Sequence, residues 1–422
     1  MKIPEALSPF RSRNYRLFFA GRTFALPGMW ISQTAIGWLV YDLTQSTLMS
    51  GTAMFLSQVS HLFVTPAAGV MFDRTDRFRM LVAVQFAMLA ASLALALYAV
   101  FNGENLAVLF TLCFVRGLVG AVEIPTRQSL VSTFVGRRED LPQAIGLNAT
   151  QFNFMRVVAP AAAGEIYARA ASLFPALARN VANLGAAACF FADVLLNVPS
   201  ILLVFALKFD GRPPAGTRRE SPLRAFAEGV RYAASVPVLR AVLVGIGLLS
   251  TFGFSYTVLL PMFAHGVYGG SAGLYGQMLT LTGAGAIVAA LTVSVLKRER
   301  LLPRFLVVGN LLVGASLVGM IFAPPLPCFL ALLFAAGFGS VLVGASSNTL
   351  IQLNVDAAHC GRVVSLYTMM FTGTFPFGTL LLGFLDERFG TGASLGLGAG
   401  VCFAIAATLF AKRRIFADGK GA

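Results

Sequence analysis

The chain has 422 residues, of which 57% are hydrophobic and 12% are charged, and its mean hydropathy is +0.77. Soluble domains carry roughly 25% charged residues, so this composition excludes a water-soluble enzyme, a disordered chain and a secreted disulfide scaffold. The formal net charge is +14. Because the basic residues stand in short connections between apolar runs, this charge indicates contact with a membrane surface rather than with nucleic acid.

The apolar runs predict an all-α polytopic membrane protein. A membrane span needs about 20 apolar residues, and twelve candidates meet this length: 15–41, 47–72, 79–101, 106–134, 143–168, 184–207, 236–262, 271–296, 304–323, 327–353, 362–386 and 391–411. The segment 208–235 between the sixth and seventh spans is polar, proline-rich and basic, and its second part has the spacing of a surface helix. We therefore predict an N-terminal six-helix bundle (1–207), a cytoplasmic linker with a surface helix (208–235) and a C-terminal six-helix bundle (236–422).

Basic residues set the predicted orientation. Of the 32 Lys and Arg residues, 25 fall on one side of the membrane and four lie within spans, whereas only Arg169, Arg179 and Arg388 fall on the other side. By the positive-inside rule both termini are cytoplasmic. The segments Gly117–Val135 and Gly337–Val355 repeat glycine, small residues, an amide and leucine in the same order. This repeat favours two pseudo-symmetric bundles, as in a duplicated transporter.

Charged residues away from the span ends are confined to the first bundle, and in residues 241–411 the charges within the span bounds (Arg304, Arg362 and Asp386) all stand at the end of a span. An ionisable group at mid-membrane costs about 2.5–3.5 kcal/mol, so each one needs a partner or a water-filled cavity. The candidates for proton coupling or charge relay are Arg116, Glu123, Arg127, Arg156 and Asp193. Arg156 is interpreted either as a cavity charge for an anionic substrate or as a partner of Glu123.

The fourth span carries a stripe of charge. Arg116, Glu123 and Arg127 are spaced by seven and four residues, which puts them on one face of a helix. Two interpretations remain open: Glu123 exchanges a proton and alternates between contacts with Arg116 and Arg127, or the three residues form a permanent triad in which the cations keep the carboxylate charged. In the fifth span, Pro160 and Gly164 form a candidate hinge, because proline removes a backbone hydrogen bond and small residues allow close helix contact.

Several motifs carry a family resemblance. The second span ends in Gly69-Val-Met-Phe-Asp73-Arg74-Thr-Asp76-Arg77-Phe-Arg79, and the fourth contains Leu112-x-x-x-Arg116-x-x-x-Gly120 followed by Glu123-Ile-Pro-Thr-Arg127. These motifs resemble those of the major facilitator superfamily, and the finer pattern is similar to its transmembrane secretion effector branch, which includes enterobactin-exporter-like proteins. The resemblance implies a bacterial inner-membrane transporter that exports amphiphilic drugs or siderophores by proton antiport.

The resemblance also implies two sets of site residues. Asp73, Arg74 and Arg77 would form a latch that closes the cytoplasmic side. The substrate cavity would be lined by residues of the first, seventh, tenth and eleventh spans, namely Trp30, Gln33, Tyr256, Phe338, Asn348 and Phe371. An aromatic wall of this kind suits a bulky amphiphile.

Other classes of protein lack their signatures in this sequence. The chain has no P-loop, no HExxH motif and no paired CxxC cysteines, so we expect neither an enzyme nor a metal site nor a cofactor. The expected partners are a small-molecule substrate, protons and the lipid bilayer, without nucleic acid, and the expected state is a monomer. The alternative function is an uptake permease or a lysolipid flippase of the same fold.

Overall fold

The computed structural model describes residues 5–101, 103–209, 211, 222–296, 299–356, 359–413 and 415–418. Side chains are described for these residues except at positions 6, 65–74, 138, 222–225 and 417–418. Every regular element in these ranges is helical. The predicted latch residues Asp73 and Arg74 therefore lie outside the described side chains.

Each predicted span coincides with one helix or with a run of consecutive helical segments. These are α1 (Arg13–Thr44), α2 (Thr47–Arg74), α3 (Arg77–Phe101), α4 (Leu106–Phe134), α5 (Leu141–Leu173), α7 (Leu184–Phe205), the run from α9 (Pro237–Leu248) through η3 (Leu249–Phe254), η4 (Ser255–Leu259) and α10 (Leu260–Met262) to η5 (Phe263–Val267), then α11 (Ala272–Leu296), α12 (Leu302–Ile321), α13 (Leu326–Asn354), the run of α14 (Cys360–Thr368), η7 (Met369–Gly373) and α15 (Phe375–Phe389), and α16 (Thr391–Ala411).

Short helical elements occupy the ends and connections. They are η1 (Glu5–Arg11), η2 (Arg138–Asp140), α6 (Pro175–Ala178), α8 (Pro222–Ser235), η6 (Glu299–Leu301) and α17 (Ile415–Asp418). The predicted surface helix of the linker corresponds to α8. Its sequence is PLRAFAEGVRYAAS, and helical periodicity puts its charged and its apolar residues on different faces. This pattern is expected of a helix that lies at a membrane interface.

The helices have the length and surface of membrane spans. Within the described residues, nine helices are long and apolar enough to cross a bilayer, and α1, α2 and α5 add helices of 32, 28 and 33 residues. Large apolar side chains are exposed along them, including Phe63, Leu195 and Val295, which are 68–76% exposed. Soluble monomeric proteins rarely expose so much apolar surface, whereas a protein embedded in lipid does. The predicted all-α membrane fold is confirmed.

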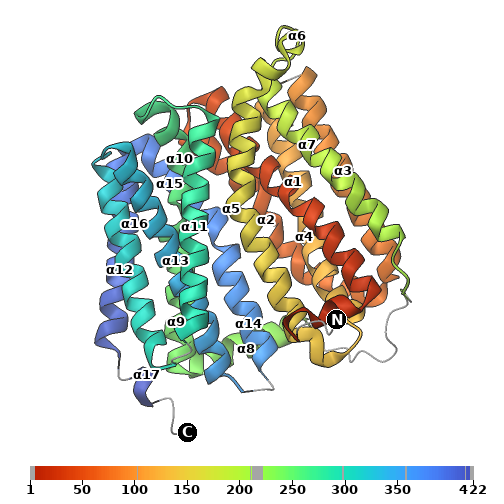
Figure 1. Cartoon of the computed structure of the whole chain (residues 1–422). Helices are drawn as coiled ribbons and strands as arrows, with labels where there is room; N and C mark the ends of the chain where they lie inside the picture. The colour runs from red at the N-terminus through yellow and green to blue at the C-terminus, as the bar shows by residue number, and fades with distance from the viewer. Residues whose placement is uncertain are drawn as a thin grey trace. The chain divides into compact units, whose positions relative to one another are not determined.

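The chain divides into two compact units. Unit 1 comprises Met1–Leu43, Leu56–Thr217 and Gly270–Thr280, and unit 2 comprises Thr44–Phe55, Arg218–Gly269 and Leu281–Ala422. Within each unit the long helices run roughly parallel to one another (Figure 1). The start of α2 thus belongs to unit 2 and the start of α11 to unit 1. The sequence-derived linker at 208–235 stays a prediction, because residues 212–221 lie outside the described part of the chain.

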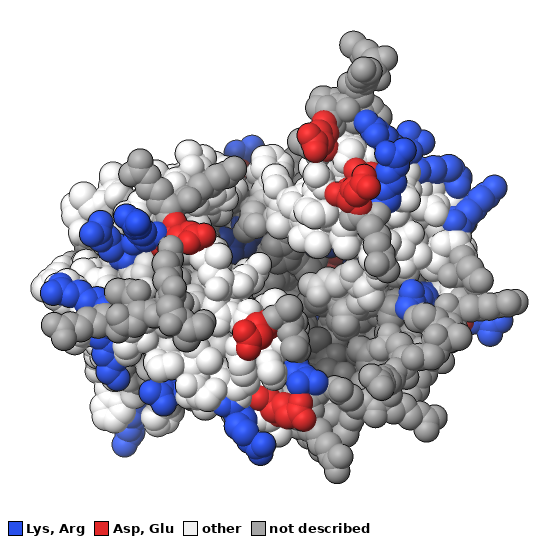
Figure 2. All heavy atoms as spheres, turned by 90° about the horizontal axis from the view of Figure 1, so that it is seen from below, with Lys and Arg blue, Asp and Glu red and all other residues white. Residues whose placement is uncertain are grey.

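Basic side chains are exposed at the helix ends where the sequence predicts cytoplasmic connections. In unit 1 they include Arg13, Arg79 and Arg137, and in unit 2 they include Arg304 and Lys412. Figure 2 views the molecule from below and shows Lys and Arg side chains exposed on that face. Their exposure agrees with the positive-inside argument, while the orientation in a membrane stays a prediction.

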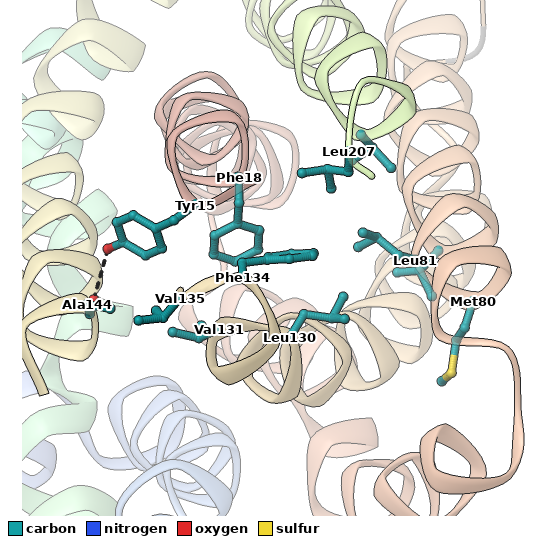
Figure 3. Close-up of a cluster of buried hydrophobic side chains, with 12 residues drawn as sticks. Tyr15, Phe18, Met80, Leu81, Leu130, Val131, Phe134, Val135, Ala144 and Leu207 are labelled. Carbon is teal, nitrogen blue, oxygen red and sulfur yellow. Dashed lines mark hydrogen bonds between the residues drawn. The ribbon is translucent and has the colours of Figure 1, made fainter. Parts of the chain in front are cut away.

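A cluster of buried apolar side chains fills one end of unit 1 (Figure 3). Phe18 of α1 and Phe134 of α4 lie at its centre, with ring centroids 5.2 Å apart. Tyr15 is fully buried and its hydroxyl donates to the Ala144 carbonyl oxygen at 3.1 Å. The cluster thereby joins α1, α4 and α5 at the end where α1 begins.

Asp76, next to the predicted latch, has a local structural role. Its carboxylate accepts hydrogen bonds from the backbone N–H groups of Phe78 and Arg79, both at 2.9 Å. These donors have no partner inside the first turn of α3, so the side chain caps the helix. The backbone N–H of Arg77 donates to the Gly211 carbonyl oxygen at 2.7 Å.

The candidate hinge lies at a close contact between backbones. A Cβ atom added to Gly276 of α11 would lie 2.4 Å from the Pro160 carbonyl oxygen and 3.2 Å from the Gly164 Cα atom. A Cβ atom on Gly164 would lie 2.6 Å from the Ala272 carbonyl oxygen. Glycine on both helices is therefore required by the packing, and the role of Pro160 and Gly164 as a hinge stays a prediction.

Replacing Gly276 by valine should force α5 and α11 apart, because its branched side chain meets rigid backbone atoms. Overpacking of this kind lowers the free energy of unfolding by about 1–3 kcal/mol. We expect a lower melting temperature of the purified protein in detergent. Gly146→Ala in the exposed face of α5 is the matched control, since no atom lies within 4 Å of its added Cβ, and it should leave the melting temperature unchanged or raise it. Equal melting temperatures for the two variants would contradict the packing argument.

Candidate functional site

A buried ion pair joins α4 to α7 in unit 1. The Nη1 atom of Arg116 lies 2.9 Å from the Oδ2 atom of Asp193, and the two side chains are 9% and 1% exposed. The sequence singles out both residues but does not pair them with each other. An ionised carboxylate is stable in such a place only when cations and hydrogen-bond donors surround it.

Three further side chains donate to the same carboxylate. Ser32 of α1 and Ser92 of α3 each donate to Oδ2 at 2.7 Å, and Asn197 of α7 donates to Oδ1 at 2.8 Å. Arg116 also donates to the Ser92 hydroxyl at 3.0 Å. One carboxylate therefore holds α1, α3, α4 and α7 together.

Glycine allows α1 to approach this carboxylate. A Cβ atom added to Gly28 would lie 2.4 Å from Asp193 Oδ1 and 3.1 Å from the Asp193 Cα atom. Ser32 follows Gly28 by four residues and so lies on the same face of the helix. The sequence analysis missed Gly28, Ser32, Ser92 and Asn197. Their only signal was small or polar residues spaced by four within apolar spans.

A second group, which we call the Glu123 cluster, comprises Arg22, His61, Glu123 and Arg127. The Glu123 carboxylate is in contact with Arg127 one turn along α4, and its side chain is 19% exposed. Arg22 of α1 and His61 of α2 are close enough to interact electrostatically with Glu123. The cluster therefore combines a partly exposed carboxylate with two arginines and one histidine.

The stripe predicted on α4 thus divides between two groups. Glu123 and Arg127 contact each other, whereas Arg116 bonds to Asp193 on another helix. Arg156 is only partly buried on α5. Glu165 forms an exposed ion pair with Arg169 at 2.8 Å, with both side chains at least half exposed, which separates it from the interior charges.

The predicted cavity residues differ in exposure. Trp30, Gln33, Phe338, Asn348 and Phe371 are all partly exposed. Tyr256 is 1% exposed, so its ring lies inside unit 2. Their assignment to a substrate cavity stays a prediction.

Unit 2 carries an aromatic group beside distorted helices. Phe254 at the end of η3 lies with its ring centroid 6.5 Å from Phe371 and 5.4 Å from Phe375, and Phe371 is stacked 6.0 Å from Tyr367. Both η3 and η7 are π-helical. Single-turn π segments inside α-helices occur frequently at functional sites.

Hydroxyl groups bind the two π segments together. Ser250 of η3 donates to the Phe371 carbonyl oxygen of η7 at 2.5 Å. The Ser255 hydroxyl lies 3.0 Å from the Ser250 carbonyl oxygen and 3.3 Å from the Phe375 carbonyl oxygen. The Thr374 hydroxyl lies 2.7 Å from the Met370 carbonyl oxygen and 3.2 Å from the Gly247 carbonyl oxygen. These bonds satisfy carbonyl groups at the distorted turns, as buried backbone groups require. The sequence pattern singles out only Phe371 among these rings, and it does not predict the π segments.

Solved structures share this fold. A POT family transporter in complex with 5-aminolevulinic acid matches with a TM-score of 0.73 at 10% identity, over 96% of this chain and 97% of that one. The nucleoside transporter NupG matches with a TM-score of 0.70 at 12% identity, over 95% and 99%. The chain therefore has the fold of a known class of membrane transporters.

The sequence identifies the family within that class. Residues 4–418 match the transmembrane secretion effector family of the major facilitator superfamily, and the chain belongs to it. The protein is therefore a secondary transporter and not an enzyme. Relatives include the staphyloferrin A transporter of Staphylococcus aureus (strain NCTC 8325 / PS 47), 25% identical over 89% of this chain and 90% of that protein, and the multidrug efflux pump Tap of Mycolicibacterium fortuitum, 24% identical over 90% of each. The resemblance stated from the motifs is confirmed.

Replacing Gly28 by alanine should displace the Asp193 carboxylate, because the added methyl group overlaps its Oδ1 atom. We expect a loss of about 1–3 kcal/mol in stability, measured by thermal unfolding of the purified protein. Gly21→Ala on the same helix is the control, because its nearest new contacts, with Ser200, are at an ordinary 3.6 Å. Equal stability of the two variants would be inconsistent with this geometry.

Arg116→Leu should be more harmful than the loss of an exposed pair. It leaves Asp193 buried without its cation, and breaking a buried pair typically costs about 3–5 kcal/mol. Arg169→Ala removes an exposed pair instead, which contributes about 0–1 kcal/mol to the stability of the folded state. Thermal unfolding and the yield of folded protein measure both variants, and a loss no larger in Arg116→Leu would show that Asp193 does not depend on Arg116.

Proposed function

We propose that this transporter exports an amphiphilic small molecule across the bacterial cytoplasmic membrane in exchange for protons, with Glu123 as the acid that binds and releases the proton. The observation that carries the proposal is a partly exposed carboxylate, in contact with Arg127, inside an apolar span. Such a carboxylate is expensive to keep in a membrane and is a functional site by default.

Glu123 is preferred over Asp193 as the proton carrier. Asp193 is 1% exposed and accepts hydrogen bonds from four side chains, and donors of this kind favour the charged form. Arginine does not release its proton in proteins, so Arg116 and Arg127 act only as fixed cations. In this proposal the buried pair is structural, and protonation of Glu123 frees Arg127 from its contact.

The cargo is proposed from unit 2. Phe254, Tyr367, Phe371 and Phe375 form a partly exposed aromatic group, and such surfaces bind bulky apolar molecules through large contact areas. Two relatives support an amphiphilic or siderophore-like cargo by their names alone, one as a siderophore transporter and one as a multidrug efflux pump.

Three further expectations belong to the same proposal. Pro160 and Gly164 act as a hinge, both termini are cytoplasmic, and residues 1–207 and 236–422 act as the two moving bundles. In such a transporter an inward proton gradient drives the outward movement of cargo as access to a central site alternates.

Glu123→Gln should abolish proton-driven export, because the amide cannot take up a proton. Cells that express the protein are loaded with ethidium or with fluorescein, two fluorescent amphiphiles of opposite charge, and loss of dye is followed with and without a protonophore. We expect rapid, protonophore-sensitive loss of at least one dye from the wild type and from the control Glu165→Gln, and slow loss from Glu123→Gln.

Three outcomes would each refute a part of this proposal. Efflux that continues at the same rate after the gradient has collapsed would exclude proton antiport. Unchanged coupling in Glu123→Gln would remove Glu123 as the carrier, and net accumulation of dye in energised cells would favour the uptake permease over the exporter.

A further inference from the structure

A small chamber lies inside unit 1 between α1, α3, α4 and α7. Its polar lining consists of Gln85, Arg127 and Ser200, and Gly21 closes it from α1. Phe18, Leu81, Val204 and Leu207 also line it and belong to the apolar cluster of Figure 3. The chamber has room for about one water-sized molecule or ion.

The chamber is lined by donors that lack acceptors. Gln85 and Ser200 are each 1% exposed, and within the described part of the chain neither the Gln85 Nε2 atom nor the Ser200 hydroxyl has a hydrogen-bond partner. The Nε atom of Arg22, which lies close to Arg127, is likewise buried without a partner among the described residues. Buried donors are rarely left unpaired in native proteins, so these atoms indicate a missing acceptor.

The charges around the chamber favour an anion as that acceptor. Among the described side chains of α1, α3, α4 and α7, the interior cations are Arg22, Arg116 and Arg127, and the interior carboxylates are Glu123 and Asp193. Asp193 is paired with Arg116, so Glu123 is the one remaining carboxylate for both Arg22 and Arg127. This leaves one positive charge in excess next to donors that point to no acceptor.

We propose that the chamber binds a small monovalent anion such as chloride, held by Arg127, Gln85 and Ser200, and that this anion and a proton on Glu123 bind cooperatively. When Glu123 takes up a proton, Arg127 and Arg22 lose their carboxylate, and the anion becomes their remaining countercharge. His61 of α2 is also close enough to interact electrostatically with this carboxylate. The cooperative part rests on the proposed function, whereas the site itself does not.

The site is tested by binding rather than by transport. The melting temperature of the purified protein is measured over a series of chloride concentrations, with gluconate keeping the ionic strength constant because it is too large for the chamber. An anion that binds the folded state raises the melting temperature with increasing concentration. We expect Gln85→Leu and Ser200→Ala each to weaken chloride binding about tenfold, because each removes one donor to a charged ligand.

Ser346→Ala is the matched control. Ser346 is a fully buried serine in α13 of unit 2 whose hydroxyl also lacks a partner among the described residues, so it reproduces the loss of a buried hydroxyl away from the chamber. It should leave the chloride concentration at half-saturation unchanged. A melting temperature that does not respond to chloride, or an equal response in Ser200→Ala, Gln85→Leu and wild type, would overturn the site and leave water as the acceptor.

Cooperativity is tested by Glu123→Gln, which imitates the protonated acid. Thermodynamic linkage is reciprocal: if a proton on Glu123 raises the affinity for the anion, the bound anion raises the affinity for the proton by the same factor. We expect the half-saturating chloride concentration to fall about tenfold in Glu123→Gln. An unchanged value would overturn the cooperative part while the Gln85 and Ser200 results uphold the site, and neither result depends on whether dye efflux is driven by protons.

Discussion

The cost of charge inside an apolar bundle governs this structure. Asp193 is tolerated there only because Arg116, Ser32, Ser92 and Asn197 surround its carboxylate. The same requirement brings four helices to one point and makes glycine necessary at position 28. A hydrogen-bond network and a packing constraint are therefore one set of contacts in unit 1, so the helices cannot shift without altering the hydrogen bonds of a buried charge.

The two units differ in chemistry. Among the described side chains, the buried ion pair and the Glu123 cluster both lie in unit 1, where α4 carries Arg116 toward the pair and Glu123 and Arg127 toward the cluster. In unit 2 the distinctive features are aromatic rings and two π-helical turns joined by the hydrogen bond from Ser250 to the Phe371 carbonyl oxygen. This difference between the units is consistent with the proposed exchange of protons for an amphiphilic molecule.

Helix α4 gives the two charge groups a physical connection. Arg116 and Arg127 are three turns apart on α4, and Arg127 lines the same chamber as Gln85 and Ser200. On α7, the polar residues Asp193, Asn197 and Ser200 are spaced by four and three residues, so they lie on one face of the helix. In the proposed function, a change of charge at Glu123 acts first on Arg127, which lines the same chamber as Ser200 of α7.

The sequence by itself determined the spans, the family and the residues that carry charge. Span length and apolar content are local properties, so all twelve predicted spans fall on helices, and helical periodicity was enough to put Arg116, Glu123 and Arg127 on one face. Only the tertiary structure decided the partners. Ser32 and Asp193 are 161 residues apart in the chain, and nothing local in an apolar helix records which neighbour it will face. The π-helical turns were likewise undetectable, because hydroxyls on one span satisfy carbonyl groups on another.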